Sequence, residues 1–225
     1  MSNAVLPEER QFEIAMHLHN EGMFGVYEDP NDFITLKSER VSPHYLNLRP
    51  GIASTETRHI IARGMLDLAS MDGSEFEHIV GTPEAFTSYA TTMADISGTS
   101  LLQPRVAKKE SGNKVPILGK FTPEDRVALF DDVVTDGRTK IDTISGLGAA
   151  GLNVTGYFVV MDRQEGGAPQ VAEETGINIQ SVLRVANVVR MLRAENVYSV
   201  TQFDNVREYL ERYGDSDALE SMGTA

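Results

Sequence analysis

Cysteine is absent from the 225 residues of this chain, so a disulfide framework and thiolate chemistry are both excluded. A protein without disulfides fits the reducing cytoplasm best, and we expect a cytoplasmic location. No apolar run approaches the roughly 18 residues that span a bilayer, so no membrane contact is expected. The N-terminal segment carries Glu8, Glu9 and Arg10 instead of the apolar stretch of a signal peptide, and a leader is not expected either.

Positive charge is scarce, because 20 Lys and Arg stand against 33 Asp and Glu, which gives a net charge of −13. Such an acidic chain is a poor partner for nucleic acid or for an acidic membrane. One basic cluster departs from this pattern, within a segment that has no helical or strand periodicity. Long loops of this kind are usually functional, and we interpret the cluster as a collector of a polyanionic ligand rather than as a solvated loop. Its cations are Arg105, Lys108, Lys109, Lys114 and Lys120.

Strand-like and helix-like segments alternate along the chain. Expected strands cover residues 33–36, 45–48, 77–80, 100–103, 127–134, 154–161 and 179–185, the first two forming a hairpin across residues 37–43. Expected helices cover residues 6–21, 54–68, 140–150 and 203–213, and a further helix follows the turn at residues 81–83 and runs to about residue 96. Loops are expected at 104–122 and 162–169, with a frayed end from Asp215. This alternation predicts one α/β domain whose parallel sheet has helices on both faces. Ligands are then expected at the carboxyl ends of the strands.

Residues 127–139 carry the most chemical information in the chain. An apolar strand runs into the adjacent carboxylates Asp131 and Asp132, and a turn rich in threonine and glycine leads to a helix pattern near Lys140. Backbone N–H groups and hydroxyls in such a turn suit a phosphate at a helix N-terminus. Gly137 allows a close backbone approach. Because the carboxylates can accept hydrogen bonds from ribose hydroxyls, this segment predicts a site for a ribose 5-phosphate.

This segment resembles the phosphoribosyl pyrophosphate (PRPP) binding motif of the type I phosphoribosyltransferases. The resemblance implies their α/β fold, a parallel sheet with helices on both faces and a small N-terminal hood. It implies one domain over residues 1–225, with the hood at about residues 1–50 plus a C-terminal segment and the core at about residues 54–185. It assigns PRPP binding to Asp131, Asp132, Val133, Val134, Thr135, Asp136, Gly137, Arg138 and Thr139.

Two segments resemble the orotate phosphoribosyltransferases within that family. Residues 33–47, with a lysine followed by Ser-Pro and Tyr45, are similar to the hood of these enzymes. The resemblance implies that Lys37 contacts PRPP and orotate, and that Tyr45 and Leu46 cover the pyrimidine. Asp-Arg-Gln-Glu at residues 162–165 is similar to the strand end whose arginine binds the orotate carboxylate, a role that falls to Arg163. A flat anionic base does need an apolar face and a cation, and Thr135 is expected to contact it as well.

The basic cluster resembles the catalytic loop of these enzymes, which begins with an arginine and has a lysine four residues later. Arg105 and Lys109 match those positions, whereas Val106 and Ser111 stand where the family usually has a lysine and a histidine or tyrosine. The turn at residues 81–86 corresponds to the segment that contacts pyrophosphate. Glu84 and Ala85 occupy its contacting positions, and they provide neither the lysine nor the threonine found in many members.

The resemblance implies that the chain converts orotate and PRPP to orotidine 5′-monophosphate and pyrophosphate. Arg105 and Lys109 are expected to stabilise the departing pyrophosphate, and Asp131 and Asp132 to hold the ribose. The implied cofactor is Mg²⁺ held mainly by PRPP, with protein ligands that the sequence does not identify. The implied assembly is a homodimer with a shared active site, and neither nucleic acid nor a membrane is an expected partner.

Two alternatives remain open at this stage. The chain is a phosphoribosyltransferase for another base, or it is a PRPP-binding regulator without catalytic activity on the same scaffold. Ala85, Val106 and Ser111 favour the regulator, whereas Lys109 favours an enzyme. The five scattered histidines give no zinc motif, and no Gly-x-Gly-x-x-Gly or Gly-Lys-Ser/Thr loop supports another nucleotide site.

Overall fold

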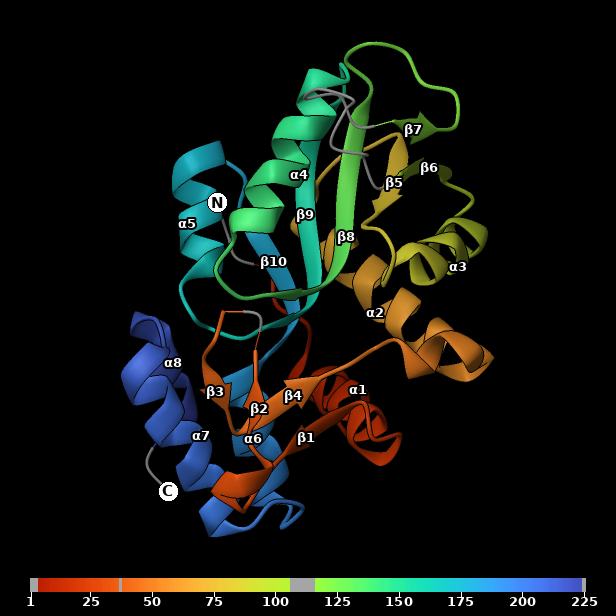
Figure 1. Cartoon of the computed structure of the whole chain (residues 1–225). Coiled ribbons are helices and arrows are strands. Elements are labelled where there is room, and N and C mark those ends of the chain that lie inside the picture. The colour runs from red at the N-terminus through yellow and green to blue at the C-terminus, as the bar shows by residue number, and fades with distance from the viewer. Residues whose placement is uncertain (1–3, 37, 106–115, 224–225) are drawn as a thin grey trace.

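The computed structural model describes residues 4–36, 38–105 and 116–223 of the chain. Its centre is a six-stranded sheet with the strand order β10-β9-β8-β5-β6-β7 (Figure 1). Five strands are parallel, and only the edge strand β7 runs antiparallel to its neighbour β6. The strands are β5 (His78–Gly81), β6 (Ser100–Pro104), β7 (Ile117–Leu118), β8 (Arg126–Val134), β9 (Asn153–Asp162) and β10 (Ile179–Arg184).

Helices cover both faces of this sheet, as the sequence predicts. On one face, α2 (Thr55–Asp72) and α3 (Thr87–Ser97) pack on a core that includes Phe130 and Phe158. On the other, α4 (Arg138–Ala149) and α5 (Gly167–Thr175) pack on a core that includes Leu129 and Val159. Neighbouring residues of β8 and β9 therefore point to opposite cores, which is the period-two alternation of a strand buried on both sides.

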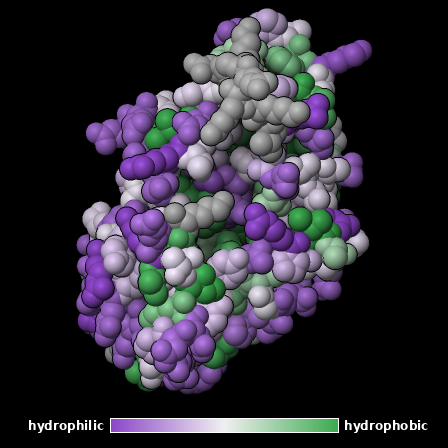
Figure 2. All heavy atoms as spheres, in the orientation of Figure 1, coloured by the Kyte–Doolittle hydropathy of each residue, from purple (hydrophilic) through white to green (hydrophobic). Residues whose placement is uncertain are grey.

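A smaller hood lies beside the sheet, built from both ends of the chain (Figure 1). Its N-terminal part has α1 (Glu8–Asn20), two short antiparallel strand pairs and the 3₁₀ turns Pro30–Asp32 and Pro50–Ala53. The strand pairs are β1 (Phe24–Val26) with β4 (His44–Leu46), and β2 (Ile34–Thr35) with β3 (Val41–Ser42). Its C-terminal part has α6 (Val185–Ala194), α7 (Val200–Tyr213) and α8 (Ser216–Met222). The face in view is largely hydrophilic, and hydrophobic residues gather mainly over the hood (Figure 2).

The expected hairpin of residues 33–36 with residues 45–48 is wrong. The first strand pairs with β3, and β4 pairs instead with β1, a strand that the sequence analysis did not predict. Strands of two or three residues contain too little apolar alternation to specify a partner. Pro43 lies between β3 and β4, and its carbonyl accepts a hydrogen bond from the N–H of Tyr27 at 2.8 Å, which brings the chain toward β1.

Other boundaries also differ from the expectation. The expected loops at residues 104–122 and 162–169 contain β7 and the start of α5. Helix α4 begins at Arg138 rather than near Lys140, and the helix expected after the turn at residues 81–83 begins at Thr87. Helix α6 was not expected because it follows β10 without a glycine or proline to mark the boundary. The C-terminal segment is a helix rather than a frayed end, with Ala218 and Met222 buried in the core. No helix in the described ranges has the length and apolar character needed to cross a membrane.

The packing of α8 gives a stability prediction. Met222 is 1% exposed and Leu219, on the same helix, is 41% exposed. Met222→Ala is therefore expected to lower the free energy of unfolding by about 2 kcal/mol, because it leaves a cavity in the core. Leu219→Ala, the matched control, should change it by less than about 0.5 kcal/mol. Urea denaturation followed by circular dichroism measures both, and equally small losses would show that α8 does not pack on the core.

Candidate active site

Residues at the carboxyl ends of β5, β6 and β8, with the first turns of α4, line a cavity of about 450 Å³. This end of a parallel sheet is where ligands bind in open α/β folds. The cavity carries charges of both signs, since Arg49 and Lys140 line it together with four acidic residues and Arg105. Six residues that the sequence analysis assigns to PRPP line it: Glu84, Ala85, Arg105, Asp131, Asp132 and Thr139.

The carboxylate of Asp131 is held by four donors. Its Oδ1 accepts hydrogen bonds from the Thr82 hydroxyl and from the backbone N–H of Asp132, the latter at 2.8 Å. Its Oδ2 accepts hydrogen bonds from the Lys140 ammonium and from the Tyr157 hydroxyl, the latter at 3.1 Å. Lys140 and Asp131 form a buried ion pair. Burial opposes ionisation of Asp131, but these donors outweigh it and keep the pKa of its carboxyl below the ordinary value.

Asp132 lies in a different environment. Its Oδ1 accepts the N–H of Val133 at 2.7 Å, and within the described ranges no donor reaches its Oδ2. Desolvation, followed by repulsion from Asp131, raises the pKa of Asp132 to about 6. Both carboxylates line the cavity, and Asp132 is thus the one with an acceptor oxygen that has no donor within the described ranges.

The turn after β8 is closed by contact with the start of α5. Gly137 caps α4 with a φ of 73°, in the left-handed region that favours glycine. A Cβ on Gly137 would lie 2.7 Å from the carbonyl oxygen of Gly167. A Cβ on Gly167 would in turn collide with the carbonyl of Thr135 and lie 2.7 Å from the backbone nitrogen of Gly137. The two loops are therefore in backbone contact, which leaves no room for a side chain at either glycine.

Arg163 lies at the end of β9, beside the end of β8, where its N–H donates to the carbonyl of Val134 at 3.2 Å. Its guanidinium is buried, with Nε 2.7 Å from Oε1 of Glu165 and Nη2 2.9 Å from the Ser42 hydroxyl of the hood. No partner for Nη1 occurs among the residues that the structure describes. The arginine is thus oriented by two fixed contacts and keeps donors for a ligand.

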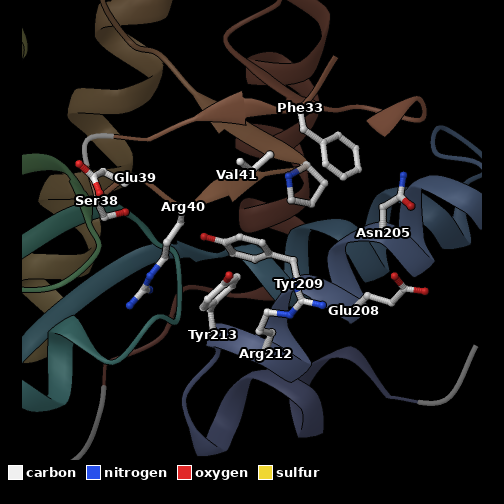
Figure 3. A pocket seen from close by; sticks show the side chains of 11 residues that line it. Phe33, Ser38, Glu39, Arg40, Val41, Asn205, Glu208, Tyr209, Arg212 and Tyr213 are labelled. Atoms are coloured by element: carbon white, nitrogen blue, oxygen red, sulfur yellow. The ribbon is translucent and has the colours of Figure 1, made fainter. Parts of the chain in front are cut away.

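Glu165 connects Arg163 to both parts of the hood, to the N-terminal part through Arg40 and to α7 through Tyr209. Its Oε1 also accepts the Tyr209 hydroxyl at 3.0 Å, and its Oε2 accepts Nη1 of Arg40 at 2.8 Å. Arg40 and Tyr209 line a cavity of about 440 Å³ between the N-terminal part of the hood and α7, and the guanidinium of Arg40 lies 5.0 Å from the centre of the Tyr213 ring (Figure 3). One carboxylate therefore joins three elements that are far apart in the sequence.

The structure does not bring all the expected site residues together. Lys37 and Lys109 lie outside the described residues, as do Val106 and Ser111. Tyr45 lines a different cavity, with His19 and Tyr198, and the partly buried Leu46 packs against the main core. Of the turn residues, Val134 and Gly137 are buried, Val133, Thr135 and Asp136 are partly exposed, and Arg138 is exposed.

Four residues that contact the expected site were not singled out in the sequence analysis: Thr82, Tyr157, Lys140 and Glu165. A lysine in the first turn of a helix that follows two aspartates was a signal for Lys140, because a buried lysine needs an acidic partner. The sequence offered no comparable signal for Tyr157, since only the register of β8 against β9 brings it to Asp131.

Comparison with known proteins supports the resemblance. The chain is 31% identical over 161 residues to the orotate phosphoribosyltransferase of Caenorhabditis elegans, covering 72% of this chain and 70% of the relative. It is 32% identical over 150 residues to the orotate phosphoribosyltransferase of Pyrococcus furiosus, covering 67% and 82%. The solved structure of Leishmania donovani UMP synthase superposes with a TM-score of 0.79 at 26% identity, over 90% of this chain and 42% of that one. No protein-family model matches the chain.

The contact between the two loops gives a second prediction. Gly167→Ala should push the turn at residues 135–137 away from α5 and weaken binding of ribose 5-phosphate by about tenfold or more, because a misplaced donor set loses its hydrogen bonds to the phosphate. Gly148→Ala is the matched control, since no atom lies within 4 Å of its Cβ position. It should leave binding unchanged and raise stability by up to about 1 kcal/mol. Isothermal titration measures the affinities, and unchanged binding in Gly167→Ala would contradict a phosphate site in this turn.

Proposed function

The chain belongs to the orotate phosphoribosyltransferase family, and we propose that it transfers the ribose 5-phosphate of PRPP to orotate, giving orotidine 5′-monophosphate and pyrophosphate. The observation that carries this proposal is the adjacency of two strand ends. The end of β8 has the paired carboxylates and the turn suited to a phosphate, and the end of β9 has Arg163 in backbone contact with β8. A sugar phosphate and an acidic base bound at these two ends would meet at the anomeric carbon.

The PRPP site of this proposal extends from the turn after β8 into the 450 Å³ cavity. The turn from Thr135 to Thr139 would bind the 5-phosphate through backbone N–H groups and hydroxyls, at the positive end of the α4 dipole. Asp132 would accept the ribose hydroxyls through its free oxygen. Arg105, which is exposed and lines the cavity, would face the pyrophosphate together with the backbone of Glu84 and Ala85. Lys109 of the partner subunit, which lies beyond the described residues, is proposed to join them.

Magnesium is the proposed cofactor. No group of three or more His, Cys, Asp or Glu side chains within the described ranges is arranged to hold a metal ion. Mg²⁺ is commonly bound by one or two carboxylates with substrate phosphates and water, so an ion held mainly by PRPP fits these residues. The exposed Glu84 lines the cavity proposed for the pyrophosphate. When bound, it would supply positive charge to the leaving pyrophosphate.

The base site of this proposal centres on Arg163. A guanidinium with free N–H groups can bind a carboxylate through two parallel hydrogen bonds, which a lysine cannot. The fixed contacts to Glu165 and Ser42 would hold the fork in place before orotate arrives. Lys37, Tyr45 and Leu46 are proposed to complete the site from the hood, which for Tyr45 requires a change from its present position in another cavity.

Cleavage of the bond between the anomeric carbon and pyrophosphate would leave a ribose with oxocarbenium character and a departing polyanion. The residues proposed here stabilise both charges without a covalent nucleophile. Asp132 lies on the ribose side, where a carboxylate favours developing positive charge, and Arg105 lies on the pyrophosphate side. Exclusion of water from the cavity when both substrates are bound would prevent hydrolysis of PRPP.

A PRPP-binding regulator is the second candidate. Ala85 favours it, because a methyl group lines the cavity where many members of the family place a lysine or threonine. A phosphoribosyltransferase for another base is disfavoured by Arg163, whose buried guanidinium suits an acidic base. A cytoplasmic location is part of the proposal and is consistent with a chain that lacks cysteine.

The role of Arg163 gives the third prediction. Arg163→Ala should raise the KM for orotate by about tenfold or more, the value of a charge-assisted hydrogen bond, with the KM for PRPP within about twofold. Arg163→Lys should be intermediate, because it keeps the charge without the fork. The control is Arg207→Ala, since this arginine on α7 is exposed and its ion pair within the described part of the chain is with Glu211 on the same helix. Steady-state kinetics, followed by the loss of orotate absorbance, give both KM values. An equal rise in the KM for orotate and the KM for PRPP would exclude Arg163 from the base site.

A homodimer with a shared active site is the fourth prediction. We propose that the segment around Lys109 serves the neighbouring chain, as the resemblance implies. Lys109→Ala and Asp132→Asn should each be nearly inactive alone. In a mixed dimer one site receives the normal Lys109 from one chain and the normal Asp132 from the other. After random exchange about half the dimers are mixed and half their sites are intact, so about a quarter of normal activity should return. Verified exchange without recovery would show that the segment serves its own chain.

A further inference from the structure

The buried ion pair between Lys140 and Asp131 makes Asp131 and Asp132 differ in the hydrogen bonds that they can accept from a ligand. A carboxylate offers about four acceptor sites. In Asp131 all four are taken, by Thr82 from the end of β5, the N–H of Asp132, Lys140 from α4 and Tyr157 from β9. Asp131 is 6% exposed and Lys140 8% exposed, so water competes little for these contacts.

If a ribose hydroxyl replaced any of these donors, the displaced donor would remain buried without a partner, which is unfavourable for binding. Lys140 would be left as a buried cation without its partner, which is strongly destabilising. The hydroxyl of Tyr157, which is fully buried, would lose its only recorded acceptor among the described residues. A ribose hydroxyl that binds Asp132 displaces no protein donor, because one of the carboxylate oxygens of Asp132 has no donor within the described ranges. The two carboxylates are adjacent in sequence and differ in their capacity to accept a ligand.

We propose that Lys140 is a positioning residue that, with Thr82 and Tyr157, fills the acceptor sites of Asp131, so that Asp132 alone receives the ribose hydroxyls of PRPP. This inference rests on the proposed function, because it names how that ribose is bound. Asp131 then acts through its neighbour, by fixing the end of β8 through the N–H of Asp132. Lys140 balances the charge that two adjacent carboxylates would otherwise place in one cavity.

The charges around Asp132 determine the sign of the pH effect. Burial, followed by repulsion from Asp131, raises the pKa of Asp132 to about 6, and the Lys140 ammonium opposes this rise. Asp132 lies close enough to Tyr89 of α3 to raise the pKa of that tyrosine, and Arg58 of α2 lowers the pKa of the same tyrosine. The other charged groups lining the cavity are Arg49, Arg105, Glu84 and Asp142. Asp132 is therefore ionised above about pH 6 and loses its charge below it, and without Lys140 this transition moves to higher pH.

The test measures PRPP affinity by isothermal titration, with Mg²⁺ and without orotate, on both sides of the Asp132 pKa of about 6. Lys140→Met should weaken the binding of PRPP about tenfold near neutral pH. It should also shift the acid limb, which is the pH range over which PRPP affinity falls on acidification, up by about one pH unit. Lys140→Arg, which keeps the charge, should leave the limb in place. An unshifted limb in Lys140→Met overturns the proposal, since a merely structural lysine would lower stability without moving it.

The double variant Lys140→Met with Asp131→Asn separates the two carboxylates. It removes both charges of the ion pair, so it is expected to fold even if Lys140→Met alone does not. If Asp131 acts only through its neighbour, the double variant binds PRPP within about threefold of the unaltered protein, because the charge near Asp132 is restored. A larger loss shows that Asp131 itself holds the ribose and overturns the proposal. Absence of PRPP binding in the unaltered protein would instead contradict the proposed function.

Discussion

The backbone contact between the turn at residues 135–137 and Gly167 is the constraint on which the rest of the site depends. The loops that follow β8 and β9 meet without intervening side chains, because Gly137 and Gly167 each lack the Cβ that would separate them. That contact fixes the entry of α4, where a phosphate would bind, against the entry of α5. Since β8 and β9 are hydrogen-bonded neighbours, Arg163 at the end of β9 is held beside the same turn. The distance between the proposed phosphate and base sites is therefore set by the sheet.

Buried charge determines which groups remain available to ligands. Asp131 is neutralised by Lys140, and Glu165 by Arg163 and Arg40, so two of the most buried acids of the site are fully partnered. Such pairs contribute little net stability, but breaking one leaves an unpaired buried charge, and they therefore hold their side chains in one arrangement. They leave Asp132 and part of the Arg163 guanidinium as the groups that can exchange protein contacts for substrate. Both parts of the hood take part in this arrangement, the N-terminal part through Arg40 and α7 through Tyr209. The sequence analysis gave neither residue a role.

The sheet and the turn at its carboxyl edge could be predicted from the sequence because they are encoded locally. Each feature of this segment predicts its local structure from a few neighbouring residues. This holds for the apolar run of residues 127–134, for its acidic pair and for the glycine of the turn. The role expected of Arg163 came from the resemblance of Asp-Arg-Gln-Glu at residues 162–165 to the orotate phosphoribosyltransferases. The contacts of Tyr157, Lys140 and Tyr209 could not be predicted in the same way, because each depends on register or packing between distant segments. The pairing of β4 with β1 was missed for the same reason, and the burial of α8 because its short helix has only two core residues, Ala218 and Met222.

The central claim is that one chain joins an acidic base to the ribose of PRPP at the ends of two neighbouring strands. The most direct measurement is pyrophosphate release on mixing the protein and Mg²⁺ with PRPP and, in separate reactions, orotate, uracil or hypoxanthine. The account predicts release with orotate, accompanied by an equal loss of orotate absorbance, and little release with uracil, which lacks the carboxylate that Arg163 would bind, or with hypoxanthine. Comparable release with uracil or hypoxanthine would contradict the assigned base site, and PRPP binding without release from any base would identify a regulator instead of an enzyme.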